Sequence, residues 1–209
     1  MITKLDYAAL SALVYNNARG DINYFPVPTV EGWSSIAAPT NPTGGFTAEA
    51  YKNGNDIVIA FKGTDTANVY DFALDMATNL TLGFGGASDQ LVQAALFYAK
   101  VRSDPQFADC NISFTGHSLG GGLASVLSVW FDLPATTFAE APFENTALNP
   151  YSMSKVENYM TTAGYGSIAN QLSYFDLVAN YSARQSQVTN YYVPGEILQN
   201  LRTDRKSVV

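Results

Sequence analysis

The chain has 209 residues, 47% of them hydrophobic, and carries a formal net charge of −7. That length and apolar content are enough for one compact domain with a substantial core. The acidic balance argues against nucleic acid or an anionic bilayer as an electrostatic partner. The single cysteine, Cys110, allows no internal disulfide and no cysteine metal cluster.

The N-terminal residues lack a long apolar stretch, and no run in the chain approaches eighteen uninterrupted apolar residues. We therefore expect neither an N-terminal signal peptide nor a transmembrane segment. Localisation stays open between the cytoplasm and export by a C-terminal signal beyond residue 209.

Apolar residues at helical spacing predict a first helix over residues 4–15. Prolines and glycines then fill residues 22–45, a pattern typical of an irregular surface excursion. Residues 46–51 and 56–61 are β-prone and flank Asn53-Gly54, so they predict a β-hairpin.

The rest of the chain alternates between helix and strand, with no internal repeat and no linker. The sequence predicts helices at 87–103 and 152–163, and strands at 135–138, 171–175 and 188–193, in addition to a β-rich run from residue 111 to a turn at 116–120. This alternation predicts an α/β fold, a mostly parallel sheet covered on both faces by helices.

The turn at 116–120 reads Gly-His-Ser-Leu-Gly and joins the β-rich run to small, helix-compatible residues. It is the G-x-S-x-G pattern of a nucleophile elbow in the strand–turn–helix context that gives the pattern its meaning. Gly116 and Gly120 lack the Cβ atoms that would collide where the strand doubles back. Ser118 is therefore the candidate nucleophile, at the positive end of the following helix.

A serine nucleophile needs a general base, and the only histidine of the chain is its neighbour, His117. At the x position of the elbow, the histidine side chain should leave the turn in a different direction from Ser118. A triad histidine instead approaches from another loop and is oriented by a carboxylate. We interpret His117 as a packed residue that shapes the elbow, so the sequence offers a nucleophile without an evident base.

Three segments resemble the class 3 (fungal-type) lipases of the α/β-hydrolases, in that family's order, and bacterial members in particular. They read I-V-I-A-F-K-G-T-D at 57–65, I-S-F-T-G-H-S-L-G-G-G-L-A-S at 112–125 and L-S-Y-F-D-L-V at 172–178. The chain departs from the family at Lys62, where arginine is usual. The resemblance implies a serine carboxylic-ester hydrolase acting on acylglycerols or phospholipids, with no metal and no organic cofactor.

Two groups are expected to stabilise the oxyanion formed during ester attack. One is the backbone N–H of Leu119, the residue after the nucleophile. By resemblance the other is Thr64, through its N–H and its hydroxyl. The alternative is that Gly63-Thr64 forms an ordinary turn at the end of a strand.

Asp176 is the candidate carboxylate of the triad, because it follows an apolar run in the chain order Ser, Asp, His. Its alternative is a solvated loop aspartate. In relatives a segment like Val193-Pro194-Gly195-Glu196-Ile197-Leu198 is followed by a loop that bears the histidine.

Residues 204–209, Asp-Arg-Lys-Ser-Val-Val, can be encoded by the first codons of a widely used sequencing-library adapter. We therefore expect a domain over 1–203, a non-native tail over 204–209, and a truncated, metagenomic reading frame in which the C-terminal part of the fold is missing. A native basic tail is the alternative. Different codons in the nucleotide sequence would contradict the first interpretation.

Residues 69–88 mix apolar side chains with glycines, directly after the oxyanion segment, where lipases of the family carry a flap. The segment is either such a lid, which would contact a lipid interface, or an amphipathic stretch that faces the core.

The function predicted from these features is a triacylglycerol lipase or phospholipase A type hydrolase that works through an acyl-enzyme on Ser118. Without a triad histidine, the 209 residues predict very low activity. A thioesterase or acyltransferase of the same fold, or a non-catalytic binding module, is the alternative.

Overall fold

The computed structural model describes residues 1–19, 30–40, 43, 45–63, 89–192 and 207–208. Several expectations from the sequence fall outside this part of the chain: Thr64, the candidate lid at 69–88, the segment 193–198, and residues 204–206 and 209 of the proposed tail.

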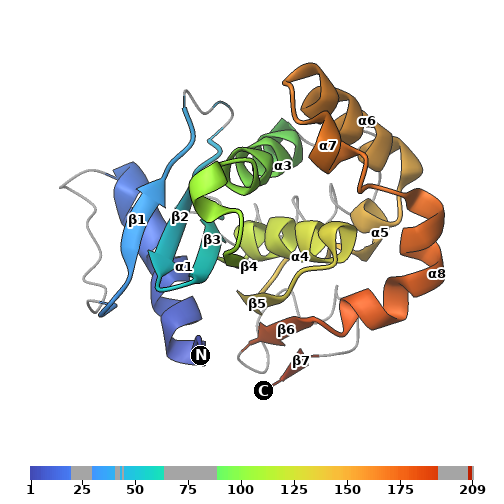
Figure 1. Cartoon of the computed structure of the whole chain (residues 1–209). Helices are drawn as coiled ribbons and strands as arrows, with labels where there is room; N and C mark the ends of the chain where they lie inside the picture. The colour runs from blue at the N-terminus through green and yellow to red at the C-terminus, as the bar shows by residue number, and fades with distance from the viewer. Residues whose placement is uncertain (20–29, 41–42, 44, 64–88, 193–206, 209) are drawn as a thin grey trace.

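A mixed sheet of seven strands forms the centre of the described structure, with the strands in chain order across the sheet (Figure 1). The second strand is antiparallel to both the first and the third, and the third to the seventh strands are parallel to one another. The strands are β1 (Ser34–Ala37), β2 (Ala48–Asn53), β3 (Asp56–Phe61), β4 (Asn111–His117), β5 (Ala135–Phe138), β6 (Val188–Tyr191) and β7 (Ser207–Val208).

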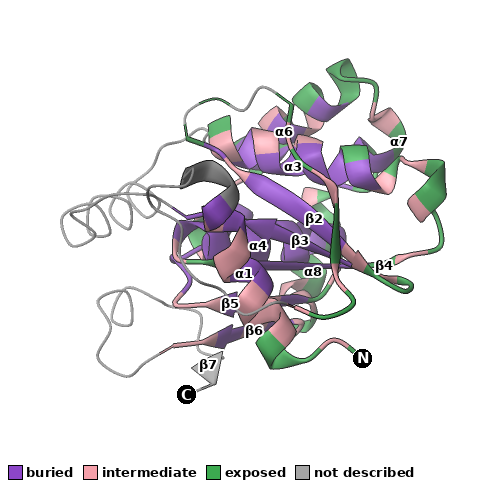
Figure 2. Ribbon diagram, turned by 90° about the vertical axis from the view of Figure 1, so that its left-hand side faces the viewer, coloured by how far each residue is buried: buried purple, intermediate pink, exposed green. Residues whose placement is uncertain are grey.

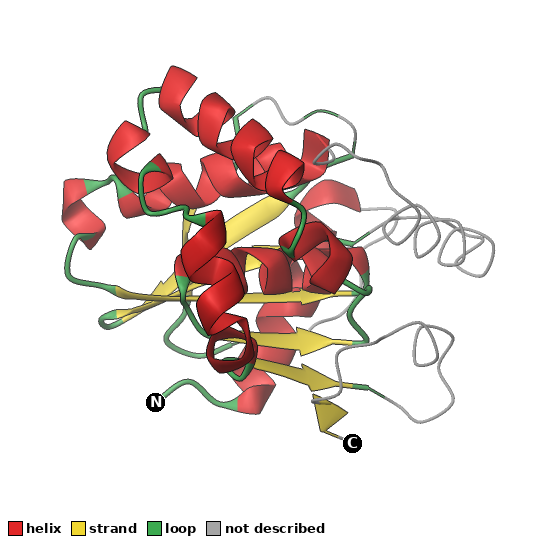
Figure 3. Cartoon of the chain, turned by 90° about the vertical axis from the view of Figure 1, so that its right-hand side faces the viewer, coloured by secondary structure: helices red, strands yellow, loops and turns green. Residues whose placement is uncertain are grey.

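The parallel strands bring their carboxyl ends to one edge of the sheet (Figure 3). Ligands of open α/β sheets bind outside this edge. Any site built on strand ends in this fold is therefore expected there.

The hairpin predicted around Asn53-Gly54 is confirmed as β2 and β3. Asn53 pairs with Asp56, so Gly54 and Asn55 form the turn, one residue later than predicted. Gly54 has a φ of 57°, which favours a residue without a Cβ atom. The hairpin makes β3 the innermost antiparallel strand, directly beside β4.

Helices cover both faces of the sheet (Figure 1). The three helices predicted from apolar spacing are confirmed as α1, α3 and α6, with small shifts at their ends. The described helices are α1 (Lys4–Arg19), α3 (Asp89–Arg102), α4 (Leu119–Phe131), α5 (Glu144–Ala147), α6 (Pro150–Thr162), α7 (Gly166–Ala169) and α8 (Tyr174–Gln185), with a short 3₁₀ turn at Pro105–Phe107.

Side chains of β3 alternate between two cores. Ile57, Ile59 and Phe61 join the larger core with α3, α4 and α6, whereas Val58 and Ala60 pack against α1. This alternation follows from the two-residue period of a strand. The predicted fold class, a mostly parallel sheet flanked by helices on both faces, is confirmed.

Helix α4 is the most enclosed helix of the fold. All thirteen of its residues are buried, and it contacts β3, β4, β5 and β6 as well as α3, α5 and α8 (Figure 2). A helix that is apolar on every side is stable only in such a setting. Its N-terminus therefore has a fixed position at the carboxyl edge of the sheet.

Two predictions about secondary structure are wrong. The stretch 171–175 is not a strand, because α8 begins at Tyr174 and Ser173 caps it by accepting the Asp176 N–H at 3.3 Å. The sequence Ser-Tyr-Phe-Asp is itself a helix-start signal that could have indicated this. The irregular region 22–45 also contains β1, which pairs with β2.

Candidate active site

Ser118 lies at the junction between β4 and α4, the sharp turn that the elbow pattern predicts. Its φ of 55° and ψ of −123° are rare for a residue with a side chain and store strain. Three backbone hydrogen bonds hold the turn: the Ser118 N–H donates to the Phe138 carbonyl at 3.0 Å, and the Ser118 carbonyl accepts from Gly122 and Ala141 at 3.0 and 2.9 Å. The half-buried serine is thus fixed between the ends of β4 and β5.

The glycines of the elbow are required by close packing. A methyl group on Gly116 would lie 2.4 Å from the carbonyl carbon of Gly120, and one on Gly120 would lie 2.1 Å from the Phe61 carbonyl oxygen. Both separations are far below van der Waals contact. These glycines let α4 rise directly from β4 and press against the end of β3.

Leu119 is the first residue of α4, so its backbone N–H has no carbonyl partner within the helix. That N–H belongs to the positive end of the helix, where a developing negative charge is stabilised. The end of β3 runs beside it: a methyl group on Gly63 would lie 3.5 Å from the Leu119 nitrogen. The chain continues from Gly63 into Thr64, which lies outside the described residues.

His117 is exposed, and its ring lies against Tyr15 of α1. The ring centroids are 6.4 Å apart with an interplanar angle of 62°, and the Tyr15 hydroxyl lies 3.4 Å from His117 Nδ1. Helix α1 covers the face of the sheet opposite to α4. His117 therefore has an aromatic partner on the α1 side, whereas Ser118 begins the helix of the other side.

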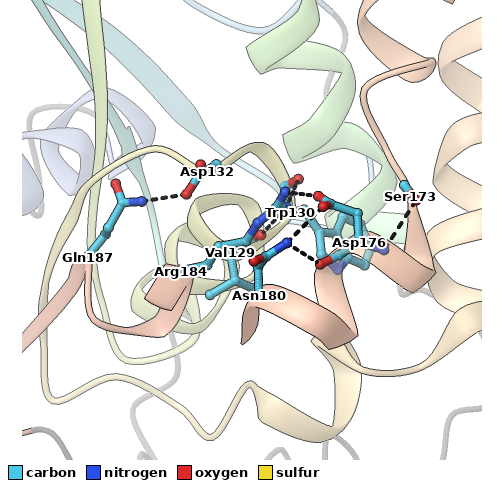
Figure 4. Close-up of polar contacts among 8 residues, drawn as sticks. All are labelled: Val129, Trp130, Asp132, Ser173, Asp176, Asn180, Arg184 and Gln187. Carbon is cyan, nitrogen blue, oxygen red and sulfur yellow. Dashed lines mark hydrogen bonds and ion pairs between the residues drawn. The ribbon is translucent and has the colours of Figure 1, made fainter. Parts of the chain in front are cut away.

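Asp176 lies in the first turn of α8 and not at the end of a strand. Its carboxylate accepts hydrogen bonds from Asn180 and Arg184, and the same guanidinium donates to the carbonyls of Val129 and Trp130 (Figure 4). Those carbonyls belong to the last turns of α4. Ser118 comes directly before the first residue of α4, so it lies about 16 Å from these carbonyls along the helix axis.

The structure therefore does not bring Asp176 to Ser118. The acid joins the start of α8 to the end of α4 through Arg184, whose side chain is only 12% exposed. The predicted location, on the same edge of the sheet as the serine, is wrong. The physical reason is that Ser173 caps a helix that begins at Tyr174, so the segment does not form the predicted strand whose end would have placed Asp176 at that edge.

The ion pair gives a prediction about stability. Since the Asp176 side chain is half exposed, we expect a coupling energy of about 0.5–1 kcal/mol with Arg184. A double-mutant cycle of Asp176→Ala and Arg184→Met, followed by urea unfolding, measures it. A coupling energy within error of zero would contradict the bridge between α8 and α4.

Sequence reasoning missed Glu140, which is only 3% exposed and follows the end of β5. One of its carboxylate oxygens accepts hydrogen bonds from the hydroxyls of Ser125 on α4 and Thr137 on β5, at 2.5 and 2.6 Å. Its backbone N–H donates to Asn190 Oδ1 on β6 at 3.3 Å. An acidic residue just after a short apolar strand was the available signal.

Glu140 connects three elements close to the nucleophile, namely α4, β5 and β6. Gly121 makes room for it, because a methyl group there would lie 2.8 Å from the Glu140 Cβ. The next residue, Ala141, donates its N–H to the Ser118 carbonyl. Glu140 is therefore a brace: its carboxylate joins β5 to the first two turns of α4, and its backbone N–H joins β6.

Removing this brace should destabilise the fold. Glu140→Ala deprives two buried hydroxyls of their acceptor, so we expect a loss of roughly 2–3 kcal/mol in the free energy of unfolding. Urea denaturation measures it. The exposed Glu31→Ala is the matched control and should change stability by less than about 0.5 kcal/mol. Equal values for the two variants would contradict the role of Glu140.

No group of three or more His, Cys, Asp or Glu side chains in the described part of the chain could hold a metal ion. Among the helices described, none has the length and apolar character needed to cross a bilayer.

The mixed sheet, the strained serine between strand and helix and the helix N-terminus beside it define an α/β-hydrolase fold. The chain belongs to the phospholipase-like family described as the Tle-like phospholipase domain, whose sequence model matches residues 6–209. A search of curated proteins returned no match.

Two solved fungal structures resemble the chain. The Lip2 lipase from Yarrowia lipolytica is 16% identical with a TM-score of 0.50, and the match covers 93% of this chain and 71% of that one. Carboxyl esterase 2 from the mycorrhizal fungus Tuber melanosporum is 12% identical with a TM-score of 0.37, over 96% and 82%. At 16% identity the likeness to the Lip2 lipase concerns the fold alone.

Proposed function

We propose that the chain is a serine carboxylic-ester hydrolase of the lipase or phospholipase A type, with an ester lipid as its substrate. The observation that carries the proposal is the strained Ser118 at the N-terminus of α4, with the Leu119 N–H beside it. Membership of a phospholipase-like family supports the same class of reaction.

In this proposal Ser118 Oγ attacks the carbonyl carbon of the ester and passes its proton to a base. The oxyanion accepts hydrogen bonds from the Leu119 N–H and from Thr64, and collapses with expulsion of the alcohol, which takes up the proton. Water then hydrolyses the acyl-enzyme and releases the acid. Loss of one oxyanion donor in such a site costs about 10²–10³ in rate.

In this proposal the acid of the triad is not Asp176, because its carboxylate is bound to Arg184 near the far end of α4. Glu140 is close to the elbow, but its carboxylate holds Ser125 and Thr137 beneath it. In this fold the acid, Asp or Glu, follows the nucleophile in the chain order Ser, acid, His. The first carboxylate after β6 along the sequence is Glu196, outside the described residues, and it takes the place of Asp176 in the proposal.

A fluorophosphonate probe tests the nucleophile directly. Ser118 Oγ displaces fluoride from phosphorus and leaves a covalent adduct that peptide mass spectrometry locates. We expect the adduct on Ser118 and its disappearance in Ser118→Ala. An imidazole-dependent rise in p-nitrophenyl butyrate hydrolysis that survives Ser118→Ala unchanged would instead favour a non-catalytic fold or a different nucleophile.

A further inference from the structure

Tyr15 connects α1 to the edge of the sheet that carries Ser118. Its hydroxyl oxygen accepts the Gly63 N–H at 3.0 Å, so the phenol holds the chain at the point where it leaves β3. Gly63 comes directly before Thr64. A contact made from the opposite face of the sheet thus fixes the segment that leads to the second oxyanion donor.

The same hydroxyl also reaches the elbow. It lies 3.4 Å from His117 Nδ1, and the two rings meet edge to face. A phenol can accept one hydrogen bond and donate another. Its oxygen accepts from Gly63, so its proton is available for donation to Nδ1 when that nitrogen carries none. Tyr15 therefore contacts both Gly63, just after β3, and His117, the residue before the nucleophile.

Tyr15 is also close to the Leu119 N–H. A methyl group on Gly63 would lie 2.6 Å from the Tyr15 hydroxyl, 2.6 Å from the His117 carbonyl oxygen and 3.5 Å from the Leu119 nitrogen. The hydroxyl and that nitrogen are therefore no more than about 6 Å apart.

We propose that Tyr15 is a positioning residue for ester hydrolysis: it holds Gly63 beside His117 and so fixes the end of β3 against the N-terminus of α4, where the Leu119 N–H lies. This role rests on the proposed function. It matters because preorganised donors stabilise the oxyanion without reorganisation, and a displacement of about 1 Å can cost about 10²-fold in rate.

The chain offers a matched control in Tyr7, a second tyrosine of α1. Its hydroxyl donates to Ser113 Oγ at 2.9 Å, four residues before His117 on β4 and away from the elbow. Tyr15→Phe and Tyr7→Phe therefore delete the same atom from the same helix, and each breaks a hydrogen bond to the sheet or its edge. Only the first touches the oxyanion side of the site.

Hydrolysis of p-nitrophenyl butyrate in the presence of added imidazole, with the rate of Ser118→Ala subtracted, provides the first measurement. We expect Tyr15→Phe to lower kcat about 10-fold and to leave KM within about twofold, since the donors act on the transition state. Tyr7→Phe should leave both constants unchanged. Equal kcat values for the two variants would overturn the proposal, as would an effect of Tyr15→Phe on KM alone.

Amide hydrogen exchange of Gly63, followed by NMR, provides a measurement that needs no activity. We expect Tyr15→Phe to accelerate this exchange and Tyr7→Phe to leave it unchanged, because only the first removes the acceptor. Unchanged exchange in Tyr15→Phe would show that the contact itself is absent and overturn the proposal. Faster exchange with hydrolysis that ignores Ser118→Ala would instead overturn the proposed function and, with it, the positioning role.

Discussion

Hydrolysis of p-nitrophenyl butyrate by the 209-residue chain should be close to background. Loss of the histidine alone from a Ser-His-Asp triad costs about 10⁶ in kcat, because the serine can no longer lose its proton as it attacks. The only histidine here is His117, whose ring lies against Tyr15 on the α1 side of the elbow. A residual acceleration of about 10³–10⁴ over water from the oxyanion site and substrate binding should persist.

Two variants and one additive make this expectation specific. Ser118→Ala should change the residual rate little, because the oxyanion site and substrate binding supply it without the triad. His117→Ala should likewise reduce it by less than about 10-fold, because that ring shapes the elbow without taking the proton. Added imidazole should raise the rate of the wild type in excess of the rate with Ser118→Ala. Robust hydrolysis that disappears in His117→Ala would show that the adjacent histidine is the working base.

Gly120→Ala should be among the most destabilising substitutions of a small residue in this chain. The added methyl group would lie 2.1 Å from the Phe61 carbonyl oxygen, and both atoms belong to buried backbone segments. Relief requires β3 and α4 to separate at the elbow. We expect a loss of about 3 kcal/mol in the free energy of unfolding and a fall in Tm of roughly 6–12 °C.

The control is Gly166→Ala, at the first residue of α7. A methyl group there meets nothing within 4 Å, so stability should change by less than about 0.5 kcal/mol. Thermal unfolding followed by circular dichroism compares the two. If Gly120→Ala unfolds within 2 °C of the wild type, at the scale of about 2–4 °C per kcal/mol for a chain of this size, the close approach of α4 to β3 is not as described.

The local features of the sequence determined most of the secondary structure. Apolar spacing located α1, α3 and α6, and a turn signal flanked by β-prone runs located the hairpin of β2 and β3. Glycines at 116 and 120 identified the turn at Ser118, because only glycine tolerates that contact. Such features are readable from sequence since each depends on residues a few positions apart.

Only the tertiary structure decided which distant groups meet at the site. Asp176 shows the limit: its strand-like sequence became the first turn of α8, and its position was set by Arg184 and by carbonyls of α4. Tyr15 and Glu140 show the converse, since each lies far along the chain from some of its partners at the edge of the sheet. Sequence spacing specifies local conformation, but contacts between distant segments depend on how helices pack across a sheet.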